Sequence, residues 1–207
     1  NISIAGTIYT QKPDVLEQAA IDQDLNIFAQ GLEEMRARIE LLPWVKTASI
    51  ARQLPNHLRI EVQEHQPFAL WQNKGQLMLI NADGDVIIEA AVDQFPMLPL
   101  VVGEDANLEA GVLVELLSQT PELAQRVRAA IRVGTRRWDI EFDNAVLLNL
   151  PDEGLRQAWY RFVDLQKTVG ILEQGYRKLD LRLPDMLVVR PETSVPNLKQ
   201  KREGQAT

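Results

Sequence analysis

The most regular pattern of apolar and polar positions lies in residues 41–71, LLPWVKTASIARQLPNHLRIEVQEHQPFALW. In its second half, three apolar residues alternate with polar ones, as in a half-buried strand: Leu58, Ile60 and Val62. Residues 45–50 alternate less cleanly, and Pro55-Asn56 between the two halves is a turn signal. The stretch therefore predicts a β-hairpin. A further strand is expected to start after Pro67, which has no N–H for a sheet interior.

Upstream of this hairpin the pattern becomes helical. Apolar residues recur on one face in residues 12–20 and 32–42, which predicts two helices. Pro13 suits the first turn of the earlier helix, because the N–H that proline lacks has no helical partner there. Residues 2–4 predict a short first strand, and residues 22–31 predict a loop. The predicted order is β-α-α-β-β, with one helical layer on a small sheet.

After Pro67 the apolar runs are short and separated by turn residues, which predicts a region rich in strands. The first strands are expected at residues 68–71, 77–80, 86–88 and 100–103. Residues 77–80 are continuously apolar, which predicts burial on both faces. Asp83-Gly84 predicts a tight hairpin. Helical spacing predicts helices over residues 109–117, with Val112 facing inward, and 122–130.

A second hairpin is predicted further along the chain. Residues 138–142 and 146–150 alternate on either side of Asp143-Asn144. The strongest helical pattern follows, over residues 155–172. One side of this helix is apolar except for Gln166.

The last strand is predicted at residues 186–189, after a strand at 179–183 and a turn at Pro184-Asp185. A terminal strand offers unpaired N–H and C=O groups to an incoming strand. Between Leu187 and Val189 the sequence has no inward lysine and no proline to protect such an edge. The alternative, that another element covers the edge, stays open from the residues alone.

These elements predict an α+β fold in two domains. An N-terminal β-α-α-β-β module is expected over residues 1–66, and a mixed β domain with flanking helices over residues 67–191. Residues 192–207 are polar without periodicity, which predicts a disordered C-terminal tail.

Composition narrows the function classes. The chain has 207 residues, of which 45% are apolar and 25% charged, an ordinary globular balance. The net charge of −7 gives no basic field for phosphate backbones, so nucleic-acid binding is not expected. Cysteine is absent, which excludes disulfides and thiolate metal sites. No apolar run is long enough to span a bilayer.

The sequence contains few residues of two types that catalytic and metal sites often use, histidine and cysteine. The two histidines, His57 and His65, lie in a turn and at a strand end, near Glu61 and Glu64. On a strand, Glu64 points opposite to Glu61 and His65, so solvent-facing side chains are favoured over a metal site. No metalloprotease, phosphate-loop or dinucleotide motif is present. We therefore expect no catalytic residues, no metal and no cofactor.

Four short motifs carry a family resemblance, and their order covers nearly the whole chain. They are the opening ISIAG, LPWV at residues 42–45, LRIEVQEHQPFALW at residues 58–71, and Leu179-Asp180-Leu181-Arg182. This order resembles the periplasmic part of the bacterial cell division family FtsQ, called DivIB in other lineages. The resemblance implies a POTRA module followed by a larger β domain, and a non-catalytic scaffold of the divisome.

The resemblance also implies partners and a site. The resemblance implies that the final strand receives a strand of FtsB, in a complex that also contains FtsL. The implied partner-binding residues are Arg136, Arg182, Leu183, Leu187, Val188, Val189 and Arg190. From the residues alone, the Arg136-Arg137 pair fits a solvated strand entrance as well as a contact role. Arg190 stands about where some relatives carry an aromatic residue.

A short cytoplasmic tail and one membrane-spanning helix upstream of Asn1 are implied as well, with this region in the periplasm and other divisome membrane proteins as further partners.

Two other functions are compared with this one. A POTRA-bearing module of an outer-membrane export or assembly system would use the small sheet's edge for client strands. A cell-wall hydrolase would need a metal or nucleophile site, which the inventory lacks. A single POTRA module joined to a helix-containing β domain favours the scaffold.

Overall fold

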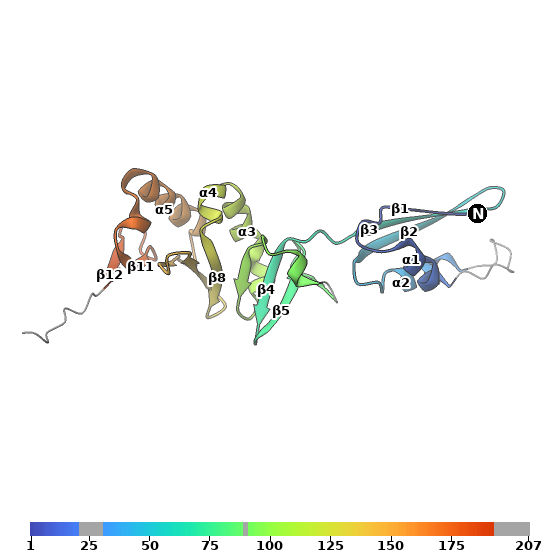
Figure 1. Ribbon diagram of the computed structural model, residues 1–207, viewed down its shortest axis with the longest axis horizontal. Coiled ribbons are helices and arrows are strands. Elements are labelled where there is room, and N and C mark those ends of the chain that lie inside the picture. The colour runs from blue at the N-terminus through green and yellow to red at the C-terminus, as the bar shows by residue number, and fades with distance from the viewer. Residues whose placement is uncertain (21–30, 89–90, 193–207) are drawn as a thin grey trace, which may run out of the picture. The chain divides into compact units, whose positions relative to one another are not determined.

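A computed structural model gives the arrangement of the predicted elements (Figure 1). The residues that it describes are 1–20, 31–88 and 91–192. The chain forms two compact units, Asn1–Ala124 and Gln125–Thr207. Helices and mixed sheets are both present, which confirms the α+β class. The loop expected at 22–31 and the tail expected at 192–207 lie outside the described residues, except for their residues Gly31 and Glu192. No helix within the described ranges is long and apolar enough to cross a bilayer.

The first unit begins with the predicted β-α-α-β-β module, which we call the small module (residues 1–65). Its elements are β1 (Ile2–Ala5), α1 (Lys12–Ala19), α2 (Leu32–Ile39), β2 (Val45–Gln53) and β3 (His57–Glu64). The sheet order is β1-β3-β2, with β1 parallel and β2 antiparallel to β3. Figure 1 shows α1 and α2 together on one face of this sheet. The module's core lies between these two helices and the sheet, and it consists of Val15, Ala19, Met35, Ile39, Val45, Ala48, Ile60 and Val62.

The rest of the first unit is a second sheet with the order β7-β4-β5-β6. Its elements are β4 (Ala69–Asn73), β5 (Gln76–Ile80), β6 (Val86–Ile87), the 3-10 helix η1 (Val92–Gln94), β7 (Leu100–Val102), α3 (Ala106–Ser118) and α4 (Pro121–Ala124). β4 pairs antiparallel with β5 and parallel with β7. Leu79 and Ile80 are fully buried, but Leu77 is 44% exposed at the start of its strand. The predicted burial of 77–80 on both faces is therefore wrong at Leu77 and only partly met at Met78.

Two further details of the first unit differ from the sequence prediction. Val112 is 46% exposed on α3, so it does not face inward. The hairpin between β5 and β6 is confirmed, but its loop runs from Asn81 to Asp85 instead of two residues. Asn81 organises this loop, because its Oδ1 accepts the N–H groups of Asp83 and Asp85, both at 2.9 Å.

The second unit is a sheet with the order β12-β11-β10-β9-β8. Its elements are β8 (Val127–Val133), β9 (Arg137–Phe142), β10 (Leu147–Asn149), α5 (Leu155–Val169), the 3-10 helix η2 (Ile171–Glu173), β11 (Tyr176–Asp180) and β12 (Val188–Pro191). The predicted hairpin of β9 and β10 is confirmed. α5 packs on this sheet through Phe162, whose ring centre lies 5.3 Å from that of Phe142.

Four boundary predictions in the second unit are wrong. The strand expected at residues 179–183 is β11, which begins at Tyr176 and ends at Asp180. Residues 122–130 do not form one helix, because α4 ends at Ala124 and Val127 begins β8, which pairs with β9. α5 ends at Val169, since Gly170 adopts the left-handed conformation that closes helices. The last strand is Val188–Pro191 rather than 186–189, so Leu187 precedes it.

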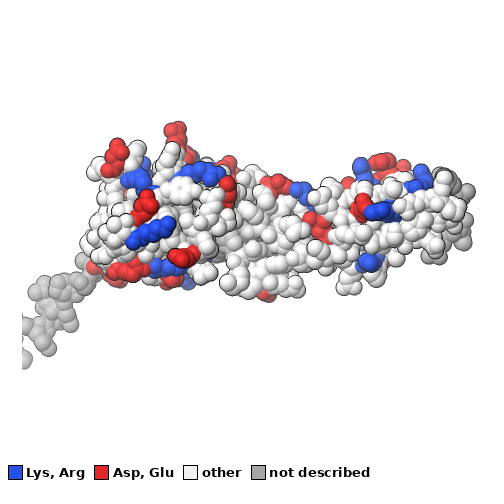
Figure 2. Space-filling model, turned by 90° about the horizontal axis from the view of Figure 1, so that it is seen from above, with Lys and Arg blue, Asp and Glu red and all other residues white. Residues whose placement is uncertain are grey.

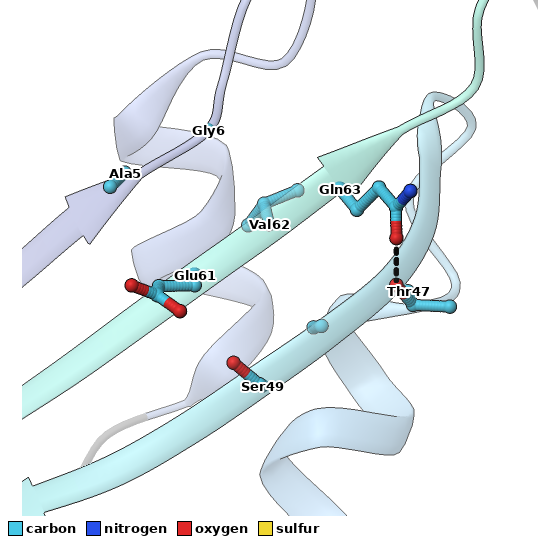
Figure 3. A pocket seen from close by; sticks show the side chains of 8 residues that line it. Ala5, Gly6, Thr47, Ser49, Glu61, Val62 and Gln63 are labelled. Atoms are coloured by element: carbon cyan, nitrogen blue, oxygen red, sulfur yellow. Dashed lines mark hydrogen bonds between the residues drawn. The ribbon is translucent and has the colours of Figure 1, made fainter.

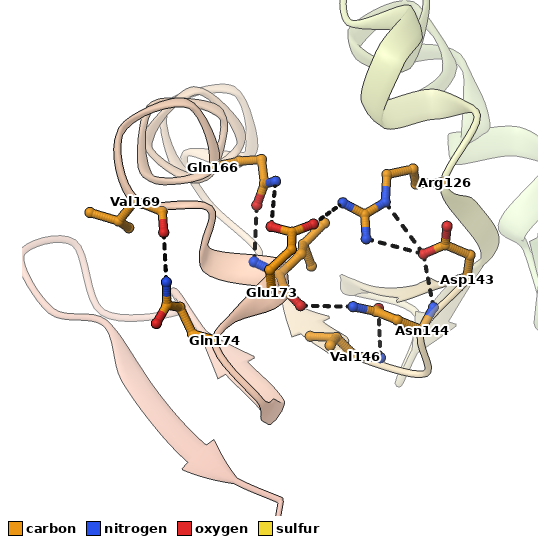
Figure 4. A network of polar contacts seen from close by, with 9 residues as sticks. Arg126, Asp143, Asn144, Val146, Gln166, Val169, Glu173 and Gln174 are labelled. Carbon is orange, nitrogen blue, oxygen red and sulfur yellow. Dashed lines mark hydrogen bonds and ion pairs between the residues drawn. The ribbon is translucent and has the colours of Figure 1, made fainter.

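Gln166, the polar exception on the apolar side of α5, has a structural role at this helix end (Figure 4). Its Oε1 accepts the N–H of Leu172 at 2.9 Å, and its Nε2 donates to Glu173 at 2.9 Å. Glu173 and Asp143 both pair with Arg126, which precedes β8. The network therefore joins the end of α5 to the turn between β9 and β10.

Candidate partner-binding edge

β12 is the terminal strand of the second unit's sheet. Within the described part of the chain it has a strand neighbour, β11, on one side. All four residues of β12 are exposed, Val188 by 50% and Val189 by 37%. The edge predicted for the last strand is therefore present, two residues further along the chain than expected.

The hydrogen bonds of β11 show which of its residues point toward β12. Leu181, which follows β11, donates its N–H to the carbonyl of Asn149 at 3.0 Å, toward β10. Main-chain groups of successive strand residues point to alternate sides. Asp180 and Lys178 therefore direct their N–H and C=O groups toward β12.

Val188 and Arg190 are the ladder partners of these two β11 residues, so their main-chain groups point back toward β11. The N–H of Glu192 donates to the carbonyl of Gly175 at 2.9 Å and gives the same alternation independently. Val189 lies between the inward-pointing residues. Its N–H and C=O therefore point away from β11, at the open side of the strand.

The side chains of β12 divide between two faces of the sheet. Val189 stands opposite Leu179, in a row that continues to Leu148; both leucines are fully buried. Val188 stands opposite Asp180, on the other face. A strand added beside β12 would continue both rows, one apolar and one polar.

Arg182 and Asp180 form an ion pair beside this edge. Arg182 Nε donates to Oδ1 and Oδ2 of Asp180 at 2.8 and 3.0 Å, and Nη2 donates to Oδ2. The Arg182 side chain is 46% exposed, whereas that of Asp180 is 16% exposed. The hydrogen bond from Arg182 lowers the pKa of the Asp180 carboxyl, despite the opposing effect of burial. The pair holds a cation at the edge in a fixed orientation.

The polar row on this face contains more residues than the sequence suggested. Asp139, Asn149 and Asp180 are ladder partners across β9, β10 and β11. Asp139 and Asn149 are buried, and Arg137 Nε lies 3.7 Å from Asp139 Oδ1. The pKa of Arg182 is raised mainly by Asp180 and also by the charge of Asp139. Alternation of apolar and polar residues does not show that this polar face of the sheet is covered.

The segment between β11 and β12 is held by α5. Arg161 Nη1 donates to the carbonyl of Leu183 at 3.3 Å, and Nη2 donates to that of Met186 at 3.2 Å. The side chains of these two residues remain 52% and 55% exposed. Sequence reasoning missed Arg161, because nothing in its spacing distinguishes it from a solvated helix residue.

The structure places the predicted site residues in two groups. Arg182, Leu183, Leu187 and β12 with its residue Arg190 lie together, whereas Arg136 is exposed in the turn between β8 and β9. β10 and β11 separate β9 from β12, a lateral distance of about 14 Å for three strand spacings. Arg136 is therefore not part of the edge itself.

A shallow groove of about 480 Å³ lies elsewhere, on the small module's sheet (Figure 3). Its polar lining includes Thr47, Ser49, Glu61 and Gln63, and Thr47 donates to Gln63 Oε1 at 3.2 Å. On the face shown in Figure 2, basic and acidic side chains are interspersed. Neither feature brings together groups with a recognisable chemistry.

Both histidines make local contacts. The ring of His57 lies 2.9 Å from Ser3 Oγ, and that of His65 lies 2.8 Å from Asn81 Nδ2. Burial lowers the pKa of His65, and Lys46 adds to this effect while Asp85 opposes it. The described residues contain no group of three or more His, Asp or Glu side chains able to hold a metal ion.

Comparison with known proteins matches both parts of the chain. Residues 1–65 match the model of the POTRA domain, FtsQ-type, and residues 69–182 match that of the cell division protein FtsQ/DivIB, C-terminal. The chain belongs to the FtsQ/DivIB family. The resemblance inferred from the four sequence motifs is thereby confirmed.

Several FtsQ relatives are similar over most of this chain. The cell division protein FtsQ of Caulobacter vibrioides is 35% identical over 194 residues, which cover 94% of this chain and 64% of that protein. FtsQ of Rhizobium radiobacter is 32% identical over 183 residues, 88% of this chain and 87% of that protein. FtsQ of Rickettsia felis is 36% identical, covering 88% and 68%. The chain thus spans about two thirds of the Caulobacter protein's length.

Proposed function

We propose that this chain is the partner-binding region of a non-catalytic divisome scaffold. It binds an FtsB-type protein, in a complex with an FtsL-type protein, by strand addition to β12, and links both to septal wall synthesis. Family membership supports the cell-division role. The observation that carries the binding mode is the outward N–H and C=O of Val189 on a terminal strand.

Strand addition takes its affinity from main-chain hydrogen bonds and its specificity from side chains. Each main-chain bond contributes only about 0.5–1.5 kcal/mol net, so a stable complex needs side-chain contacts as well. Arg182 and Leu183 supply a cation and an exposed apolar group next to the edge. Arg136 supplies a second cation across the sheet, for a partner segment that extends beyond the paired strand.

We further propose that the full-length protein is a single-pass inner-membrane protein with this region in the periplasm. The support is the FtsQ family membership of both parts of the chain. The partners then approach from the same membrane, as membrane-anchored divisome proteins.

The rival function, an export or assembly module, requires an open edge on the small sheet. β1 and β2 are both terminal in that sheet; on β2, Glu40 Oε1 accepts the N–H of Ala48 at 3.0 Å. A side chain therefore occupies a main-chain donor that an added strand would need. This contact counts against strand addition beside β2 at Ala48.

Site-directed photo-crosslinking in dividing cells tests the proposal with the full-length protein. A photoreactive residue in place of Arg190, on β12, is expected to give a single FtsB-sized adduct. The matched control replaces Lys167, which is exposed on α5 of the same unit. Equal adducts from both positions, or none from position 190, would overturn the binding site. A ladder of many polypeptides at position 190 would favour the export module.

A further inference from the structure

The segment between β11 and β12, residues 181–187, contains two exposed apolar side chains on an ordered backbone. Leu183 and Met186 are more than half exposed, yet their carbonyls are both engaged by one guanidinium. The N–H of Met186 also donates to the carbonyl of Leu183 at 3.4 Å, which closes a turn. We call residues 181–187 the β11–β12 connection.

We propose that Arg161 is a positioning residue for the partner edge, which fixes the β11–β12 connection so that β12 lies ready for a strand. This inference rests on the proposed function. Arg161 projects from the middle of α5, whose neighbours Phe162 and Val163 are buried. The backbone that carries the Arg161 side chain is therefore held rigidly, and the planar guanidinium donates hydrogen bonds to two carbonyls at once.

The other end of the connection is fixed as well. The N–H of Arg182 donates to Asp180 Oδ1 at 3.1 Å, and its side chain pairs with the same carboxylate. Arg161 thus holds the part of the connection that this ion pair does not reach. Without it, the carbonyls of Leu183 and Met186 would lose the hydrogen bonds from the guanidinium, and β12 would be tied to the sheet by a looser loop.

Preorganisation gives Arg161 an effect on binding without contact with the partner. When the binding-competent arrangement is only partly populated, the apparent Kd rises by the inverse of that population. We expect Arg161→Ala to weaken binding of a synthetic FtsB-type periplasmic segment by about tenfold. Arg161→Lys keeps one donor nitrogen in place of two, so its affinity for the segment should fall between those of wild type and Arg161→Ala.

The experiment combines amide hydrogen exchange with calorimetric titration on the whole 207-residue chain. In Arg161→Ala, the β12 amides of Val188 and Arg190 should exchange about tenfold faster, while those of α5 and β9 keep their rates. Lys167→Ala removes a charge from the same helix and should change neither exchange nor affinity.

Unchanged exchange in β12 and unchanged affinity in Arg161→Ala would overturn the positioning role. Faster exchange throughout the second unit would also overturn it, because Arg161 would then support the fold as a whole. If the wild-type chain does not bind the segment, the proposed function fails. The exchange rates of Val188 and Arg190 would still decide whether Arg161 holds the edge.

Discussion

Val188 and Val189 are neighbours in β12 whose main-chain groups point in opposite directions, Val188 toward β11 and Val189 toward the open side of the strand. Val189→Pro removes an outward N–H, and its ring blocks an added strand. We expect this change to weaken binding of an FtsB-type segment by about tenfold or more. The thermal midpoint should change little.

Val188→Pro is the matched control, because it removes an N–H that bonds to β11. It should lower the thermal midpoint more than Val189→Pro does. Calorimetric titration and thermal melts of both variants decide the assignment. A reversed order, with Val188→Pro stable and Val189→Pro unfolded, would show that the direction of the edge is wrong.

The opposite main-chain directions of Val188 and Val189 could not be predicted from the sequence. The alternation of Leu58, Ile60 and Val62 predicted β3 because a strand pattern is local. The direction of Val189 depends on a carbonyl of Asn149 two strands away. Hydrophobic spacing predicted a helix over residues 122–130, where pairing with β9 produces β8 instead.

The candidate site, like the fold, could be predicted from the sequence only in part. The family motif pointed to Arg182, and the unprotected last strand pointed to an edge. The partners of these groups, Asp139 and Arg161, were not predictable, because the ladder and the packing of α5 bring them together from distant positions. Leu187 was included because the last strand was predicted to begin at residue 186, and pairing with β11 places its start two residues later, at Val188.

Replacing Arg182 by Gln tests the ion pair at the edge without any partner. Arg182 is the main cause of the lowered pKa of Asp180, so Arg182→Gln should raise that pKa toward its ordinary value. Folding stability should fall by less than about 1 kcal/mol, because the arginine is partly exposed. An NMR titration of the Asp180 carboxyl measures the shift. An unmoved pKa would mean that the pair does not form in solution.

Glu64 makes stability depend on pH in the small module. Burial would raise its pKa, but the N–H groups of Tyr9, Thr10 and Ile8 donate to its carboxylate and lower the pKa overall. The unfolded state then binds the proton more tightly than the folded state. The stabilisation is therefore present above about pH 5 and is lost as pH falls through the folded pKa.

Glu64→Gln should flatten this acid dependence and cost about 1–3 kcal/mol at neutral pH, because it weakens the acceptor for three part-buried N–H groups. Denaturant unfolding between about pH 7 and pH 3 measures both effects. Glu61→Gln is the control, since Glu61 is exposed on the same strand and pairs with Arg59. Equal acid sensitivity of the Glu64 variant and wild type would contradict this account.

We expect residues 1–66 to fold alone. The small module's core comes entirely from its own helices and strands. Contacts with the next sheet include the Lys46–Asp83 ion pair and the packing of Trp44 against Phe95. A fragment of residues 1–66 should show a cooperative thermal transition, at a lower midpoint than the intact chain. A melt without cooperativity would place the domain boundary beyond Pro67.

Strand addition to β12 is tested most directly by the exchange rate of one amide, the N–H of Val189, with and without an FtsB-type periplasmic segment. In the free chain this N–H points away from β11, so it should exchange quickly while the N–H of Val188 is protected. At saturation with the segment, we expect Val189 to become protected to a similar degree as Val188. A segment that binds and leaves the Val189 amide exchanging at its free rate would contradict strand addition to β12.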